Sequence, residues 1–186
     1  MKRFISISTR LAWILCFLCL TALVLSSMSG CAPREEELLR YQTGALRAEI
    51  SGGLNGIEFS ATLSLDEMAE GSPRAFCLTL ASPESLRGVS FCRAADGTIS
   101  ASVGGVTCDL DDSSVDALIY LVGAFSVEGD ALDVSAINGA DAQVPDCDRL
   151  TRLVFEDYTI YLDSATSMPV KIEGGKYSLS VRVKMK

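Results

Sequence analysis

Histidine, whose imidazole is the usual general base near neutral pH, is absent from all 186 residues of this chain. Ser-His-Asp sites, Cys-His sites and the His-Glu-x-x-His zinc proteases each need an imidazole that titrates near neutral pH. No serine lies three residues before a lysine, so a Ser-x-x-Lys pair is missing as well. With 24 acidic residues, the sequence does not exclude a catalytic pair of carboxylates such as glycosidases use, but no particular pair stands out. We therefore expect a protein that is not an enzyme.

An acidic run is the second candidate for chemistry, because clustered carboxylates bind cations. An EF-hand loop beginning at Asp109 would need glycine at position 114 and glutamate at position 120, where this chain has Ser114 and Tyr120. Carboxylates at the start of a helix are stabilised by the helix dipole, which accounts for the run without a metal. We predict no metal site and no phosphate-binding glycine loop. The acidic run consists of Asp109, Asp111, Asp112 and Asp116.

The first 30 residues have the layout of a secretory signal. A basic start is followed by an apolar run from Leu11 to Leu25 and then by small residues up to Gly30. The apolar run is 15 residues long, whereas a helix that spans a bilayer needs about 20. We therefore expect residues 1–30 to be removed rather than to stay in the membrane.

The end of this segment, Met28-Ser29-Gly30-Cys31, is similar to the lipobox of bacterial lipoproteins, in which an aliphatic residue and small residues precede an invariant cysteine. The resemblance implies that Cys31 becomes the first mature residue and that its sulfur carries a covalent diacylglycerol. Two acyl chains anchor a protein stably where one is marginal. The alternative is ordinary cleavage that leaves a free cysteine. The expected location is extracytoplasmic, on the bacterial cell membrane.

The charge of the mature chain argues against some partners. Removing residues 1–30 takes away three of the 16 basic residues and none of the 24 acidic ones, which changes the formal charge from −8 to −11. Nucleic acid is therefore not an expected partner, since phosphate affinity rests on clustered Lys and Arg. An acidic surface is also repelled by anionic headgroups unless its charge is unevenly placed.

Most of residues 45–186 show an alternation of apolar and polar side chains, which is typical of half-buried antiparallel strands. Glycine-rich segments separate the runs: residues 52–56 are expected to turn the chain, and Gly104-Gly105 predicts a two-residue hairpin. The pattern predicts roughly ten strands. Its apolar positions include Leu46, Ala48, Ile50, Phe59, Leu63, Phe76, Leu78, Leu80, Phe91, Ile99, Ile172, Leu179 and Val181.

One segment, residues 113–125, lacks the alternation and predicts an apolar helix against the sheet. Ser113 and Asp116 resemble a capping box at its start. The helix is expected either to fill the core or to cover a ligand cavity as a lid. Five of its side chains fall at helical spacing and are the predicted lining of such a cavity: Val115, Leu118, Ile119, Val122 and Phe125.

Four cysteines remain if Cys31 is acylated. No two of these four have the Cys-x-x-Cys spacing that would support zinc. If Leu78 faces Phe91 on adjacent strands, Cys77 lies directly opposite Cys92, so we predict a disulfide between them. The alternative is two buried free thiols, which a reducing source would favour. A bridge between Cys108 and Cys147 is left open.

The strands, the single apolar helix and the lipobox together resemble the LolA and LolB type of lipoprotein-localisation protein. The segment Tyr161-Leu162-Asp163-Ser164-Ala165-Thr166-Ser167-Met168-Pro169 is similar to the Asp-x-x-Thr-x-x-Pro turn before a late strand of that family. The resemblance implies a curved antiparallel half-barrel, mainly β within the α+β class, with the helix on its concave side and acyl chains bound in an apolar cavity. The family's carrier uses an inward arginine, for which Arg47, Arg74 and Arg93 are candidates.

A second resemblance concerns partners. Residues 81–91 are similar to turns of GerS-type lipoproteins of Gram-positive spore formers, which bind cell-wall enzymes. The predicted organisation is a signal at residues 1–30, a tether with a short helix at 31–42, and a LolA-like domain at 43–186. We expect a membrane-anchored protein that binds an acyl chain, or alternatively one that docks to a cell-envelope enzyme.

Overall fold

The computed structural model describes residues 38–69, 71–127 and 129–186. The predicted signal, the lipobox and Cys31 lie outside these residues. No helix within the described ranges is long and apolar enough to cross a membrane. Of the predicted tether helix, the described part contains the short 3-10 helix η1 (Arg40–Gln42).

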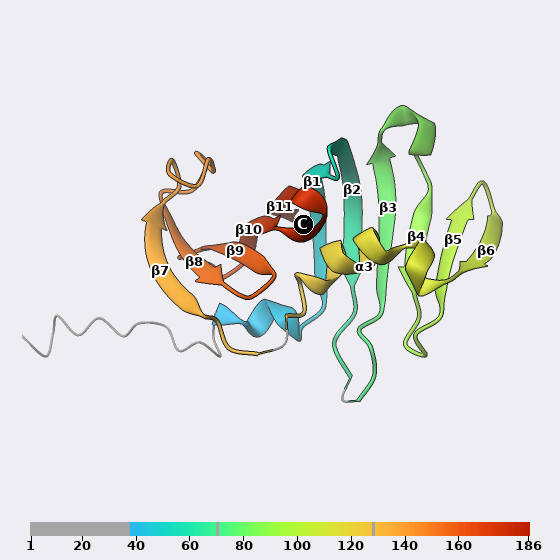
Figure 1. Ribbon diagram of the computed structural model, residues 1–186, viewed down its shortest axis with the longest axis horizontal. Coiled ribbons are helices and arrows are strands. Elements are labelled where there is room, and N and C mark those ends of the chain that lie inside the picture. The colour runs from blue at the N-terminus through green and yellow to red at the C-terminus, as the bar shows by residue number, and fades with distance from the viewer. Residues whose placement is uncertain (1–37, 70, 128) are drawn as a thin grey trace, which may run out of the picture. The chain divides into compact units, whose positions relative to one another are not determined.

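The described residues form one antiparallel sheet of eleven strands in the order β6-β5-β4-β3-β2-β1-β11-β10-β9-β8-β7 (Figure 1). The first and last strands of the chain pair with each other in the middle of this order, with Ile50 opposite Val183. The sheet is open, with β6 and β7 as its edges. The strands are β1 (Leu46–Leu54), β2 (Ile57–Leu65), β3 (Phe76–Ser82), β4 (Ser90–Arg93), β5 (Ile99–Val103), β6 (Val106–Leu110), β7 (Asp133–Asn138), β8 (Arg149–Val154), β9 (Tyr158–Asp163), β10 (Pro169–Gly174) and β11 (Leu179–Met185).

One face of the sheet carries the main core, because apolar side chains recur at every second position of the central strands. In β1, for example, buried and exposed residues alternate from Leu46 to Ile50. The helix α3 (Asp116–Gly123) packs on this inner face. The predicted fold class is confirmed: an open antiparallel sheet with one apolar helix, as the LolA-type half-barrel resemblance implies. Three further 3-10 helices are η2 (Glu84–Leu86), η3 (Asp112–Ser114) and η4 (Lys176–Ser178).

The start of α3 differs from the prediction. Ser113 belongs to η3, and the residue that precedes α3 is Val115, with no side-chain hydrogen bond capping the helix. The predicted capping box is therefore wrong, and the helix begins three residues later than expected. A tight 3-10 turn occupies the backbone that a serine cap would need.

The glycine-rich segment at residues 52–56 also differs from the turn that the sequence predicts. Gly52 and Gly53 do not turn the chain but continue β1, where Gly52 pairs with both Phe59 and Val181. A Cβ on Gly52 would overlap the carbonyl oxygen of Ser180, so glycine allows β11 to approach closely at this point. The turn itself is formed by Asn55 and Gly56, with φ values of 53° and 75°.

Candidate functional site

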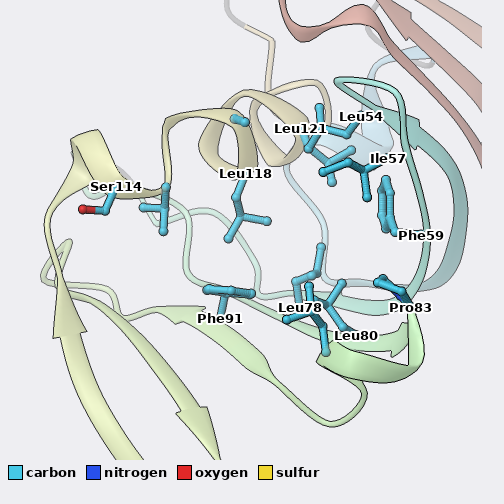
Figure 2. Close-up of a pocket in the computed structure, with 13 residues that line it drawn as sticks. Leu54, Ile57, Phe59, Leu78, Leu80, Pro83, Phe91, Ser114, Leu118 and Leu121 are labelled. Carbon is cyan, nitrogen blue, oxygen red and sulfur yellow. The ribbon is translucent and has the colours of Figure 1, made fainter.

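An apolar groove of about 260 Å³ lies between α3 and the inner face of β1–β4. Figure 2 shows helix and strand side chains converging on this space. Ser114 is the one polar side chain among the residues that line it. A site with so few polar partners does not hold ordered water well, and its lining is chemically matched to apolar groups. The lining consists of Leu54, Ile57, Phe59, Leu78, Leu80, Pro83, Leu86, Phe91, Ser114, Val115, Ala117, Leu118 and Leu121.

The floor of the groove follows from strand periodicity. Ile57 and Phe59 are two residues apart on β2, and Leu78 and Leu80 are two apart on β3, so both pairs face α3. Phe91 on β4 lies opposite Leu78 in the register. Antiparallel pairing thus gathers side chains from three strands into one continuous apolar surface.

The groove has a buried interior and an exposed mouth. Leu78 and Leu121 are each only 1% exposed, whereas Ile57 is 62% exposed and Leu86 44% exposed. Ile57 begins β2, and Leu86 lies in η2 just beyond the end of β3, so both lie at the same end of the sheet. An apolar chain could therefore enter at this end and lie against the buried side chains.

Two of the five predicted helix residues line the groove. Val115 and Leu118 contribute to the wall, while Val122 and Phe125 are buried in the main core and Ile119 is half-buried outside the lining. Ala117 and Leu121 line the groove and were not predicted. The groove lies against the side of α3 that carries Ala117, Leu118 and Leu121, whereas the predicted face was centred nearer to Ile119 and Val122. Leu121 carries no signal that would distinguish it from Val122.

The C-terminal end of α3 is held by a buried arginine. Arg74, which is 6% exposed, donates from its Nη1 to the carbonyl oxygen of Phe125 at 2.8 Å and to the hydroxyl of Ser126 at 3.1 Å. It also donates to the carbonyl oxygens of Asp66, Tyr41 and Gly44. Burial lowers the pKa of this guanidinium from its ordinary value, but arginine stays protonated in proteins. The cation therefore ties the end of the helix to the start of the domain.

The other two candidate arginines have different surroundings. Arg47 is exposed on β1. Arg93 lies over the ring of Phe76, with its Cζ 5.3 Å from the ring centre. Of the three, Arg74 is the one that contacts the segment after α3, through hydrogen bonds rather than an ion pair.

Three tyrosines form hydrogen bonds that connect α3 to neighbouring segments. The hydroxyl of Tyr158 donates to the carbonyl oxygen of Tyr120 at 2.8 Å, and the hydroxyl of Tyr120 donates to the carbonyl oxygen of Asp157 at 2.8 Å. Burial raises the pKa of Tyr158, so this hydroxyl keeps its proton. At the start of the helix, Tyr177 donates to Asp116, which lowers the pKa of that carboxyl. The helix α3, which covers the groove, is thus attached to the rest of the domain at several points.

The outer face behind the groove carries a disulfide. Cys77 and Cys92 are opposite each other on β3 and β4, with their Cα atoms 4.1 Å apart, and their sulfurs are bonded. Their chain neighbours Leu78 and Phe91 line the groove on the inner face. Cys108 and Cys147 are free thiols, exposed and half-buried respectively. Across the described ranges, no three His, Cys, Asp or Glu side chains are grouped as a metal site would require.

Comparisons with known proteins describe distant similarities in architecture. No family model and no curated protein matches the chain. An uncharacterized conserved protein from Thermus thermophilus is similar over 81% of this chain and 80% of its own, with 12% identity and a TM-score of 0.47. A chain of the MucA/MucB complex of Pseudomonas aeruginosa shows 11% identity over 81% of this chain and 53% of its own, with a TM-score of 0.40. A LolA superfamily protein from Nitrosomonas europaea shows 10% identity over 83% and 92%, with a TM-score of 0.38. At such values these likenesses carry no argument about ligand or partner.

Proposed function

We propose that this protein is a non-catalytic lipoprotein, anchored outside the cytoplasm through Cys31, that binds a single acyl chain in the groove beneath α3. The observation that supports the proposal is the lining itself, in which Ser114 is the one polar side chain. An acyl chain has no polar atoms along its length and so needs no hydrogen-bond partner in such a site. Each methylene that enters contributes about 0.8 kcal/mol.

The size of the groove limits the ligand. Pockets for drug-sized molecules measure roughly 300–1,000 Å³, whereas this one measures about 260 Å³. A single chain, or part of one, suits this volume better than the several chains of a whole lipoprotein. The proposed role is therefore that of an acceptor or sensor of one chain, with the tether at Cys31 keeping the protein at the membrane rather than letting it diffuse as a soluble carrier.

A second candidate function is docking to a cell-envelope protein. It is favoured by the exposure of Ile57 and Leu86 at the mouth, because large exposed apolar side chains mark protein contacts as well as ligand entrances. In that case an apolar side chain of the partner, rather than lipid, would enter the groove.

Native mass spectrometry separates the two candidates. The domain of residues 38–186 would be purified from its own host and then denatured in organic solvent to release bound lipid. Stoichiometric release of an acyl lipid supports the proposal. A clean mass of the unliganded domain contradicts it and favours docking, which a pull-down from envelope extracts would then test.

A further inference from the structure

The free edge of the sheet at β6 has features that the groove does not explain. Figure 1 shows β6 at the end of the strand order, beyond the strands over which α3 lies. Gly104 and Gly105 form a two-residue turn with φ values of 58° and 86°, and Val103 is opposite Val106. In such a hairpin the flanking pair exchanges both of its hydrogen bonds, and bonded pairs then alternate along the strands. Val106 and Cys108 therefore bond to β5, while the backbone N–H and C=O groups of Thr107 and Asp109 point away from the sheet.

The side chains of β6 are exposed and alternate in character. Val106 is 72% exposed and its neighbour Val103 is 53% exposed. Both lie on the inner face, since Ala101, opposite Cys108, also pairs with the groove residue Phe91. The outer face of β6 instead carries Thr107 and Asp109. An added strand would therefore meet an apolar surface on one side and a polar, acidic one on the other.

The charge at this edge is uncompensated. Asp109, Asp111 and Asp112 are all exposed. Within the described ranges, the ion pairs recorded for acidic residues involve Glu84, Glu173, Asp116 and Glu49, and none of the three aspartates of this edge. A second copy pairing here in antiparallel fashion about Cys108 would place the two Asp109 side chains diagonally across the new pair on the same face, within reach of each other. Like charges at this spacing repel, so self-association is disfavoured and a cationic partner is favoured.

We propose that β6 is a docking edge for an extended cationic segment of a partner protein, which adds to the sheet as a further antiparallel strand. Backbone groups of the segment bond to Thr107 and Asp109, which supplies affinity, and alternate side chains supply specificity. Apolar side chains of the segment continue the inner face beside Val106. A lysine or arginine of the segment on the outer face forms an ion pair with Asp109. A second basic side chain of the segment, beyond the end of β6, pairs with Asp111 and Asp112.

Peptide binding to the full chain, held in detergent, tests this proposal. The probe is a fluorescent nonapeptide of alternating lysine and valine, and the comparison peptide has glutamate in place of lysine. The lysine peptide is expected to bind, and its affinity is expected to fall with added salt because the exposed charges are screened. Equal binding of both peptides, or binding that does not respond to salt, overturns the proposal.

Two matched pairs of variants separate the contribution of backbone pairing from that of charge. Thr107→Pro removes an N–H that points away from β5, so the hairpin keeps its own bonds while the docked strand loses one, with about a tenfold loss of affinity expected. Thr107→Ala keeps the N–H and should restore binding. Asp111→Asn with Asp112→Asn should also weaken the lysine peptide, whereas the same change in charge at the opposite edge, Asp130→Asn with Asp133→Asn, should not.

Three further results would also overturn the inference. The first is a Thr107→Pro protein that is folded by circular dichroism and binds the lysine peptide as well as its parent. The second is equal weakening by the two pairs of asparagine variants. The third is a stable dimer without peptide that is crosslinked through Cys108, since a second copy would then occupy the edge. The groove variants considered below do not touch β6, so failure here leaves the acyl-binding proposal standing.

Discussion

At the residue scale, Leu118 is the side chain of α3 that is best placed to test the groove, because it projects into it (Figure 2). It lies on the middle of α3, faces the floor formed by Leu78 and Phe91, and is half-buried. Its neighbour Ile119 is also half-buried but does not line the groove. The two adjacent positions therefore allow a matched pair of substitutions on one helix.

Leu118→Trp should fill the groove and reduce acyl binding. The larger ring occupies space that a chain would need, and a loss of at least about tenfold in affinity for a fluorescent fatty acid is expected if two methylenes are displaced. Ile119→Trp is the control and should leave affinity near that of the parent. Equal affinity of parent and Leu118→Trp would show that the chain binds elsewhere.

Arg74 is the second residue on which the site depends, because it connects the end of α3 to Tyr41, Gly44 and Asp66. Arg74→Met keeps most of the side-chain volume but leaves buried carbonyl oxygens without donors. We expect a loss of about 2–4 kcal/mol in the free energy of unfolding, measured with urea. Arg47→Met, at an exposed position, should change it by less than about 0.5 kcal/mol. Similar effects of the two variants would contradict the role assigned to Arg74.

At the scale of elements, β3 and β4 form the part of the floor that is reinforced covalently. The Cys77–Cys92 disulfide joins positions 15 residues apart on the outer face, directly behind Leu78 and Phe91. β4 has only four residues, all half-buried, so it has little apolar burial of its own. The crosslink therefore supports the weaker strand of the floor.

Removing this bond should destabilise the domain. Replacing Cys77 and Cys92 together with serine frees the loop between them in the unfolded chain, for which the entropic model gives about 3 kcal/mol. The measurement is the urea midpoint of the variant against the parent, with Cys108→Ser and Cys147→Ser as the control for losing thiols. An unchanged midpoint would mean that packing alone holds β4.

At the scale of the whole molecule, membrane attachment and ligand binding are assigned to different parts of the chain. The proposed anchor at Cys31 precedes the described residues, and the groove is built entirely from residues 54–121. If residues 1–30 are removed as proposed, the formal charge of −11 would also repel anionic lipid. The lipid on Cys31, rather than surface charge, would hold the protein at the membrane.

Cys31→Ala should therefore abolish membrane retention while leaving the fold intact. A protein without acyl chains on its first mature residue has no stable anchor. Fractionation of cells that express the parent or the variant, with radiolabelled palmitate to report acylation, measures both properties. Membrane retention of the unlabelled variant would show that another segment anchors the protein.

The local features of this protein can be derived from the order of its residues. Alternating side chains predicted the antiparallel strands, placed Cys77 opposite Cys92 through the register of Leu78 and Phe91, and placed a hairpin at Gly104-Gly105. These features depend on a period of two and on turn chemistry, which are properties of neighbouring residues.

The long-range pairings and the lining of the groove depend on the tertiary structure. It paired β1 with β11, carried β1 through Gly52, and buried Arg74 beneath the end of α3. In the folded domain Leu121 lines the groove, whereas its neighbour Val122 lies in the core and does not. Each of these outcomes depends on contacts between segments that are far apart in the chain, and the same apolar pattern would suit several such arrangements. An apolar face looks alike in sequence whether it meets side chains or an open groove, because burial free energy follows the area removed from water and not the identity of what covers it.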